Sequence, residues 1–255
     1  MNPAEYIKLD RIDRDHWFYR GKRAIVRRWI DRSLKLAPED LLIDAGMGTG
    51  RWLEEMAGSC RILGVDDHDE SIELARPRIE GAGGRCLKAP LHAVDLPDGS
   101  ATVVTAMDVL EHIEDDRGAL AELVRLTRPG GLIVLTVPAL RWLWSDWDVV
   151  LHHYRRYHKA DLLELIGSVP GVKVERCEYF NAALLPAIWL VRSWRKLVPL
   201  KPGAPRAEDA IPPGPANEAL FRLLRSTGTW SWFRPPAGVS LLAVLRRTGE
   251  SADSL

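Results

Sequence analysis

The sequence has no excess of charge of either sign, because its 35 lysine and arginine residues are balanced by 35 aspartate and glutamate residues. Without a net positive field, nothing in the chain as a whole favours nucleic acid as a partner. Cysteine is scarce, and the three cysteines are scattered without Cys-x-x-Cys spacing, which argues against a disulfide framework and against a zinc site. We therefore expect a protein of a reducing compartment and predict a cytoplasmic location.

Long apolar runs are also absent. No uninterrupted run reaches the roughly 20 residues that a membrane-spanning helix needs, and residues 1–10 contain no apolar segment like that of a signal peptide. We expect a chain that is neither secreted nor membrane-spanning. Its 255 residues suffice for one sizeable core with insertions, and we predict one such domain.

What the sequence does contain is a short apolar run, Leu41–Ile43, that ends in Asp44 and three alternating glycines: Gly46, Gly48 and Gly50. The run predicts a buried strand of a parallel sheet, and the glycines allow the main chain to approach a ligand closely. The spacing is not that of a dinucleotide fingerprint, because Arg51 stands where the third glycine would be. A carboxylate at Asp44 would repel a pyrophosphate but could pair with an amino group. The implied ligand is a nucleoside that carries an amino acid.

This acid-x-Gly-x-Gly-x-Gly loop resembles motif I of the class I S-adenosylmethionine (SAM)-dependent methyltransferases, in which the loop holds the methionine end of SAM. A second strand is predicted over residues 61–66 and ends in Asp66, about 20 residues after the first glycine, where a carboxylate suits the ribose hydroxyls. We place Asp67 in the same cofactor site. A second interpretation is that Asp67 or one of the two residues after it caps the following helix.

Adenine recognition departs from the pattern of this family. Its members carry a Gly-Asp-Ala-like segment here, whose acid and following amide contact the adenine amino group, whereas this chain has Ala89-Pro90-Leu91. Proline cannot make that side-chain bond. We therefore assign adenine recognition to the Leu91 amide or to a neighbour such as His92.

A second motif follows the strand predicted over residues 101–106. The carboxyl ends of strands form the ligand crevice of a doubly wound sheet, so Met107 and Asp108 are expected to face SAM and substrate. The Asp-x-Leu-Glu-His-Ile run that begins at Asp108 resembles the motif after the fourth strand of ubiquinone-pathway O-methyltransferases, and it places His112 in the cofactor site. Alternatively, Glu111 and His112 only begin the next helix. The Arg-Pro-Gly-Gly turn at residues 128–131 adds to the resemblance.

Three of the ten tryptophans and two adjacent histidines fall in residues 139–157, after the fifth predicted strand. A loop at this edge of the sheet is where a substrate pocket is expected. It resembles relatives that read Trp-Ser-x-His-Asp followed by His-x-Arg-Arg-Tyr, although Trp147 stands where those relatives have histidine. We name His153 and His152 as candidate catalytic bases and Asp148 as the residue that orients the base.

Two other interpretations of this loop are open. In one, His152 and His153 are exposed residues at a helix start, and the neighbouring arginines bind acidic partners on the surface. In the other, the histidines bind a metal. We predict no metal site, because His152, His153 and His158 lack a carboxylate at ligand spacing.

The N-terminal segment, residues 1–37, mixes aromatic and aliphatic positions with many charges and predicts helices packed on the main body. Its His16-Trp17-Phe18 sequence resembles a His-Trp-Trp-Phe segment of a set of bacterial methyltransferases. On that resemblance Trp17 belongs to a lid over the SAM pocket. The alternative is a hydrophobic anchor.

The C-terminal part predicts strands over residues 172–180 and 239–247, separated by a long insertion. Residues 182–200 form a predicted amphipathic helix with tryptophans and the basic residues Arg192, Arg195 and Lys196. Such a helix can lie in a membrane interface. Packing on the core or in a homodimer is an equal alternative, and residues 201–215 predict a proline-rich connection.

Together these patterns predict an α/β fold: a Rossmann-like class I methyltransferase sheet of parallel strands closed by an antiparallel pair. We expect an N-terminal helical lid (1–37), a SAM-binding core (38–180 plus 238–248) and a helical insertion (181–237). The resemblance implies a SAM-dependent methyltransferase, and we expect O-methylation of a hydrophobic small molecule or lipid-linked compound. The alternative is a non-catalytic SAM-binding or interaction protein, suggested by Pro90 and Trp147. An NAD-dependent oxidoreductase is the third interpretation.

Overall fold

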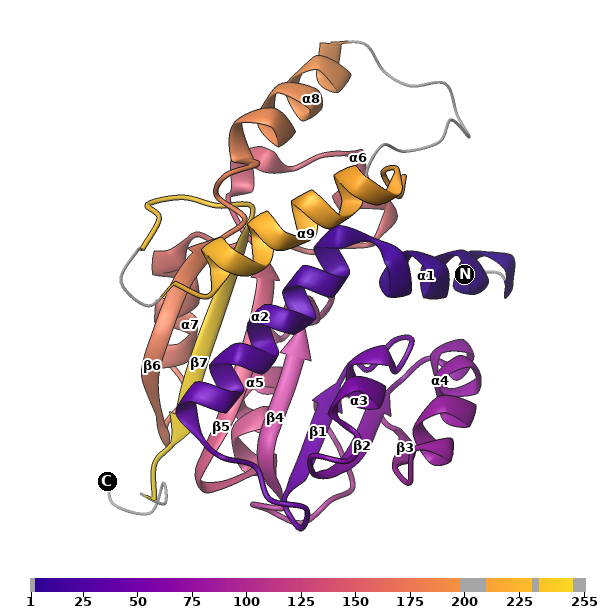
Figure 1. The fold of residues 1–255 in the computed structure, drawn as a ribbon. Coiled ribbons are helices and arrows are strands. Elements are labelled where there is room, and N and C mark those ends of the chain that lie inside the picture. Colours follow the sequence, from indigo (N-terminus) through magenta and orange to yellow (C-terminus); the bar gives the residue numbers. More distant parts are fainter. Residues whose placement is uncertain (1–2, 198–209, 231–233, 250–255) are drawn as a thin grey trace.

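The computed structural model describes residues 3–197, 210–230 and 234–249, and its strands form a single seven-stranded sheet (Figure 1). The strands are β1 Leu41–Ala45, β2 Arg61–Asp66, β3 Arg85–Lys88, β4 Ala101–Met107, β5 Thr127–Pro138, β6 Val172–Phe180 and β7 Ser240–Arg247. The helices are α1 Pro3–Asp15, α2 Trp17–Ser33, α3 Arg51–Met56, α4 Asp69–Gly81, α5 Asp116–Leu126, α6 Asp146–Val150, α7 Lys159–Gly167, α8 Leu185–Leu197 and α9 Gly214–Gly228, with short 3₁₀ turns at η1 Leu110–His112 and η2 Arg141–Leu143.

The order of the strands across the sheet is β3-β2-β1-β4-β5-β7-β6. The first five strands in this order are parallel; for example, Ile43 of β1 lies between Leu63 of β2 and Val104 of β4. β7 inserts antiparallel between β5 and β6. The predicted fold, parallel strands closed by an antiparallel pair, is confirmed.

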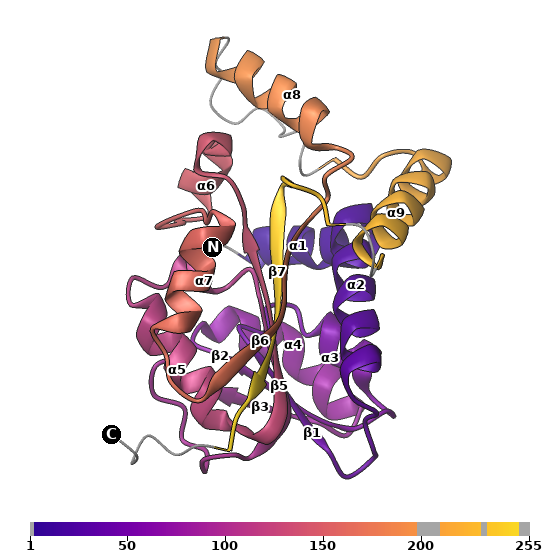
Figure 2. The same ribbon diagram turned by 90° about the vertical axis from the view of Figure 1, so that its left-hand side faces the viewer.

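Helices cover both faces of the sheet, as the second view shows (Figure 2). Alternate residues of one strand point to opposite faces. Val104 of β4 therefore belongs to one apolar core, together with Leu120 of α5, whereas Val103 belongs to the other, together with Ile30 of α2. The two resulting apolar cores explain why the parallel strands read as nearly continuous apolar runs in the sequence.

The N-terminal helix α2 lies side by side with α9, although the two are far apart in the sequence (Figures 1 and 2). The helices approach closely at Gly21, where an added Cβ would stand 2.6 Å from Cδ2 of Leu224. The Asn217 side chain accepts from the Trp17 amide at 2.9 Å and donates to the Asp15 carbonyl at 2.8 Å. The lid and the end of the insertion thus share one helical layer, and the division into lid, core and insertion stays a prediction.

Helix α8 stands away from the sheet in both views, at the end of the molecule where α6 lies (Figures 1 and 2). Within the described residues, no helix is both long enough and apolar enough to cross a membrane. The part of the predicted proline-rich connection over residues 201–209 lies outside the described residues.

Candidate active site

The glycine loop runs from the carboxyl end of β1 into α3, and its three glycines all have positive φ. A Cβ on Gly46 would stand 2.6 Å from Cγ2 of Val109, and one on Gly50 would stand 2.9 Å from Cβ of Ala75. A Cβ on Gly48 would meet no atom within 4 Å. Gly46 and Gly50 are therefore needed for packing, whereas Gly48 borders open space that a ligand can occupy.

Asp44 is the buried acid before this loop, with 2% of its surface exposed. Its carboxylate accepts a 2.7 Å hydrogen bond from the Thr105 hydroxyl, which in turn accepts from the Trp52 indole at 3.0 Å. Burial raises the pKa of Asp44 to about 8, against the opposing effect of the Thr105 hydrogen bond. A bound cation would favour the ionised form, so this position suits an ammonium group.

Asp66 ends β2 and connects the second strand to the glycine loop. Its Oδ2 accepts from the Gly48 amide at 3.0 Å and its Oδ1 from the His68 amide at 3.1 Å, and burial raises its pKa. Asp67 is more than half exposed and pairs with His68 Nδ1 at 2.6 Å. His68 occupies the N-cap position of α4 but makes no side-chain capping bond. Because Asp66 is buried and bonded to the glycine loop whereas Asp67 is exposed, Asp66 is the better placed of the two predicted acids to contact a ligand at the loop.

Leu91, predicted to contact adenine, follows the glycine loop in the sequence, and Trp17, predicted to belong to the lid, precedes it. The Leu91 side chain is buried in the core beside α5, so only its main chain is left for a ligand. Trp17 is half-buried, and its ring lies against those of His16 and Phe18. Trp17 packs against the apolar core to which Met47 of the glycine loop belongs.

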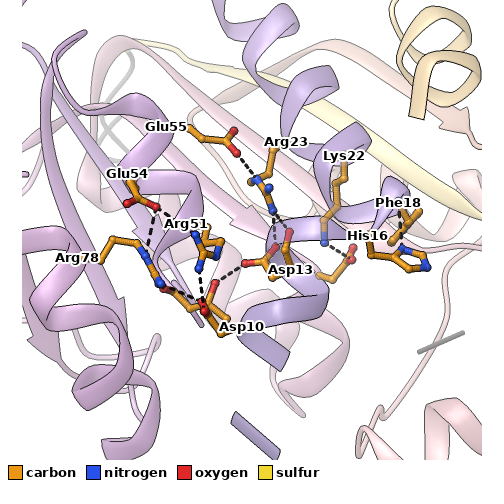
Figure 3. Close-up of polar contacts among 12 residues, drawn as sticks. Asp10, Asp13, His16, Phe18, Lys22, Arg23, Arg51, Glu54, Glu55 and Arg78 are labelled. Atoms are coloured by element: carbon orange, nitrogen blue, oxygen red, sulfur yellow. Dashed lines mark hydrogen bonds and ion pairs between the residues drawn. The ribbon is translucent and has the colours of Figure 1, made fainter. Parts of the chain in front are cut away.

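Charged residues of α1, which no motif in the sequence marks, also contact the glycine loop and the helices beside it (Figure 3). Asp10 pairs with Arg51 of α3 at 2.7 Å and with Arg78 of α4 at 2.9 Å. Asp13 bonds to the hydroxyl of Thr49 in the loop and pairs with Arg23 of α2. Helix α1 is thereby fixed over the loop by ion pairs.

Asp108 follows β4 with a left-handed backbone, φ 58°, beside the half-buried Met107. Its carboxylate accepts from Lys22 Nζ at 2.7 Å and from the Thr136 hydroxyl at 2.9 Å. Burial opposes ionisation of Asp108, but the charge and hydrogen bond of Lys22 outweigh it and hold its pKa below the ordinary value. Lys22 was not predicted as a site residue, because nothing in α2 marks it apart from its other basic residues.

The histidine loop folds back onto the η1 turn. The Tyr154 amide donates to the Glu111 carbonyl at 2.7 Å, and the rings of His112 and His153 meet edge to face with their centroids 4.6 Å apart. Burial, followed by the charge of His153, lowers the pKa of His112 to about 4. Two segments that are about 40 residues apart in the sequence therefore build one cluster.

Asp148 of α6 organises this cluster. Its buried carboxylate lies 2.9 Å from His153 Nδ1 and 2.6 Å from Arg156 Nε. Although burial opposes ionisation, the hydrogen bond with His153 and the charge of Arg156 hold the pKa of Asp148 well below its usual range. The His153 side chain is only 6% exposed, whereas His152 is exposed and outside the cluster. The interpretation of both histidines as exposed residues therefore fits His152 and not His153.

Comparison with known proteins agrees with this geometry. The sequence pattern of a family described as "Methyltransferase domain" matches residues 43–135. The ubiquinone biosynthesis O-methyltransferase of Thiobacillus denitrificans is 33% identical over 165 residues, which cover 58% of this chain and 70% of that protein. The chain belongs to the class I SAM-dependent methyltransferases. The family, fold and cofactor predicted from the sequence are thereby confirmed.

Two further methyltransferases extend the comparison. The demethylmenaquinone methyltransferase of Thermus thermophilus is 36% identical over 118 residues, 44% of this chain and 53% of that protein. A Haloferax volcanii putative methyltransferase, solved in complex with the Trm112 activator, has the same fold at 20% identity, with a TM-score of 0.64 over 96% of each chain. Among eight curated relatives, this methyltransferase chain spans between 35% and 70% of their length.

The residues of this methyltransferase fit its cofactor. Asp44 is a buried acid whose ionised form is disfavoured by burial. The ammonium of SAM is a cation that would favour this ionised form. Asp66 presents a buried carboxylate at the end of β2, where ribose hydroxyls can donate to it. Gly48, whose amide bonds to Asp66, borders open space. These three positions would hold the methionine end, the ribose and the link between them.

Proposed function

We propose that this methyltransferase transfers the methyl group of SAM to an oxygen of a hydrophobic small-molecule or lipid-linked acceptor. The observation that carries the proposal is the pair of His153 and Asp148, a nearly buried imidazole held at 2.9 Å by a buried carboxylate. A hydroxyl acceptor must lose its proton to become a good nucleophile, and an oriented imidazole is suited to accept it near neutral pH.

Each residue has a separate part in this reaction. SAM, when bound, supplies a methyl group on a positively charged sulfur. Asp44 holds the ammonium end and Asp66 the ribose, which fixes the methyl group in the crevice. His153 takes the proton of the acceptor hydroxyl as the new O–C bond forms and the S–C bond breaks, leaving S-adenosylhomocysteine. Alignment of the two reactants can lower the barrier by about 7–11 kcal/mol, and a general base adds a factor of roughly 10²–10⁴.

Two observations support a hydrophobic acceptor. The relatives from Thiobacillus denitrificans and Thermus thermophilus are named for ubiquinone and menaquinone methylation, and both names refer to quinones. In this chain, the α8 side chains of Trp189, Leu190 and Trp194 are 51%, 64% and 64% exposed. These apolar groups give α8 a surface suited to the membrane interface from which a lipid-linked acceptor would come.

The structure corrects one detail of the predicted amphipathic helix. Arg192, expected among its exposed basic residues, is 7% exposed and donates to the Leu143 carbonyl at 2.7 Å. It lies 3.9 Å from Asp148 and so belongs to the side of α8 that faces the cluster. Among residues 185–194, whose α8 side chains the structure describes, the exposed ones are therefore all apolar, whereas Arg195 and Lys196 lie outside the described side chains.

The test is formation of S-adenosylhomocysteine with a panel of phenols, catechols and carboxylic acids that carry apolar tails, measured beside calorimetric SAM binding. The proposal predicts turnover with an acceptor of this panel, and His153→Asn reduces kcat by about 10²–10⁴ while His152→Asn does not. SAM binding without turnover on the whole panel would favour the alternative, a non-catalytic SAM-binding protein. Failure to bind SAM would contradict both.

A further inference from the structure

Glu111, His112 and His153 bring one ligand atom each to within 4.8 Å of one another. Two of these residues come from the η1 turn after β4, and the third comes from the loop after α6. We propose that these three side chains bind one divalent transition-metal ion. Two imidazoles and one carboxylate are a ligand set used by proteins for such ions.

The burial of Glu111 is the first argument for an ion. The residue is 0% exposed, and neither carboxylate oxygen has a hydrogen-bond partner from another of the described residues. Lys22 and Arg156 are the nearby cations, but they are already bonded to Asp108 and Asp148. A buried carboxylate without a partner is costly, and a bound cation would remove this cost.

The orientation of the two histidines is the second argument. Metal-bound histidines generally bond through their other ring nitrogen to a carboxylate or a backbone carbonyl. His153 bonds to the Asp148 carboxylate through Nδ1 at 2.9 Å, and the backbone of Leu151 lies near enough to the His112 ring to act on its pKa. The outer partner of His153 is thus in place, and its Nε2 is left for an ion.

No carboxylate lies at ligand spacing from His152, His153 or His158 along the chain, and for this reason the sequence predicts no metal site. The fold supplies the carboxylate from Glu111, some 40 residues away, because the histidine loop pairs with the η1 turn through the Tyr154 amide. Arg156, three residues after the proposed ligand His153, pairs with Asp148 and so holds this segment in place.

The ligand types restrict the ion. Imidazole nitrogen suits Zn²⁺, Fe²⁺, Co²⁺ or Ni²⁺ better than Mg²⁺ or Ca²⁺, which prefer oxygen ligands. Three protein ligands leave at least one position open. If the proposed function holds, this position would take the acceptor oxygen, whose proton is lost more easily once the oxygen is bound to a metal. In that case His153 would be a ligand of the ion and would not be the base assigned to it in the proposed function. Methyl transfer from SAM to the acceptor oxygen would stay the same, and the proton would pass from the metal-bound oxygen to solvent.

Metal binding can be measured without SAM or acceptor, so its result is separate from that of the methyl-transfer test. Metal-depleted protein is titrated with Co²⁺, whose visible absorption bands report coordination, and with Zn²⁺ by calorimetry. The inference predicts one ion per chain, and Glu111→Gln and His153→Asn each weaken binding by at least about 10-fold. The Asp148→Asn variant, which loses the outer partner of His153, weakens it by about 10–100-fold.

Two matched controls locate the ion. His152→Asn removes the adjacent exposed histidine and leaves binding unchanged. His68→Asn tests the other group of ligand atoms, Asp66, Asp67 and His68, and also leaves binding unchanged. Loss of the ion in His68→Asn, or an unaltered ion in Glu111→Gln, would overturn the inference, as would the absence of Co²⁺ bands in the parent protein.

Folding is checked independently. Because a ligand that binds only the folded state stabilises it, Zn²⁺ raises the melting temperature of the parent protein and of His152→Asn, but not of Glu111→Gln. This comparison needs only that each variant melts cooperatively. A parent protein whose melting temperature does not respond to Zn²⁺ or Co²⁺ contradicts the site without any variant.

Discussion

The ammonium of Lys22 in α2 lies 2.7 Å from the carboxylate of Asp108 at the end of β4. This ion pair joins the N-terminal helical layer to the carboxyl end of β4, where the cofactor is expected. Its side chains are 8% and 26% exposed, so the pair is only partly screened by water. The N-terminal helices therefore contribute to the charge of the site as well as to its cover.

Replacing Lys22 with methionine keeps the length of the side chain and leaves the Asp108 charge without its partner. Removing one partner of a fully buried pair costs about 3–5 kcal/mol, and we expect about 2–3 kcal/mol here because Asp108 is partly exposed. Urea denaturation measures the free energy of unfolding. Arg76→Met is the control, since its exposed pair with Glu80 is worth about 0.3–0.5 kcal/mol. Equal losses in the two variants would contradict this account of Lys22.

Asp44 makes SAM binding depend on protons. With a pKa of about 8 in the free protein, it is mostly protonated at pH 7, and an ammonium next to it favours the ionised form. SAM binding at pH 7 should therefore release a proton, which calorimetry detects as a binding heat that varies with the ionisation heat of the buffer. Asp44→Asn abolishes this variation and weakens binding by about 10–100-fold, since hydrogen bonds to charged groups contribute about 1.5–3 kcal/mol. Asp69→Asn, an exposed acid, keeps both.

The same pKa predicts how the stability of the SAM-free protein depends on pH. Burial raises the pKa of Asp44 from 3.8 to about 8, so between these pH values the folded state keeps a proton that the unfolded state has lost. This contribution to stability is full below pH 3.8 and is lost as the pH rises toward 8. Denaturation curves of the parent and Asp44→Asn should therefore converge at acidic pH and separate with rising pH, and a constant difference would count against the raised pKa.

The glycine loop allows packing and ligand contact to be separated. Gly48→Ala places a methyl group where no atom lies within 4 Å, so the fold should lose only about 1–2 kcal/mol from the left-handed backbone, while SAM binding is lost. Gly46→Ala places it 2.6 Å from Val109 and should destabilise the fold more strongly. Melting temperature and SAM affinity are measured for both variants. Undiminished SAM affinity in Gly48→Ala would remove Gly48 from the site.

The exposed face of α8 predicts membrane association. Flotation with vesicles should carry the parent protein upward, and Trp189→Ser combined with Trp194→Ser should leave it at the bottom of the gradient. Leu163→Ser, a change at an exposed apolar residue of α7, should still float. A parent protein that stays with the soluble fraction and sediments as a dimer would instead assign the α8 face to a second copy of the chain.

The sheet could be predicted closely from the sequence because its signals are local. β2 and β6 have the bounds that the apolar run and the alternating pattern predict. The Arg-Pro-Gly-Gly turn predicted at residues 128–131 was wrong in its bounds, because these residues lie inside β5, Thr127–Pro138. The positions of Asp44 and Asp66 follow from the same signals, since strand ends in a parallel sheet meet at one edge.

The parts of the site that depend on pairing between distant segments could not be predicted. Glu111 reads as the start of a helix, and only the return of the histidine loop shows that it is buried beside His112 and His153. Lys22 reads as one of several basic residues of α2. Arg192 has a spacing in α8 that suits a basic surface. Its side chain is buried because it donates a hydrogen bond to the Leu143 carbonyl, which is distant in the sequence.

The ion pairs of Asp10 with Arg51 and Arg78 across α1, α3 and α4 bear on how the cofactor enters and leaves (Figure 3). A molecule seated at the glycine loop lies beneath a helix that is fastened by charges, so its escape requires these charges to separate first. Mobile ions weaken such attractions, and we therefore expect exchange of the bound nucleoside to quicken as the ionic strength of the solution rises.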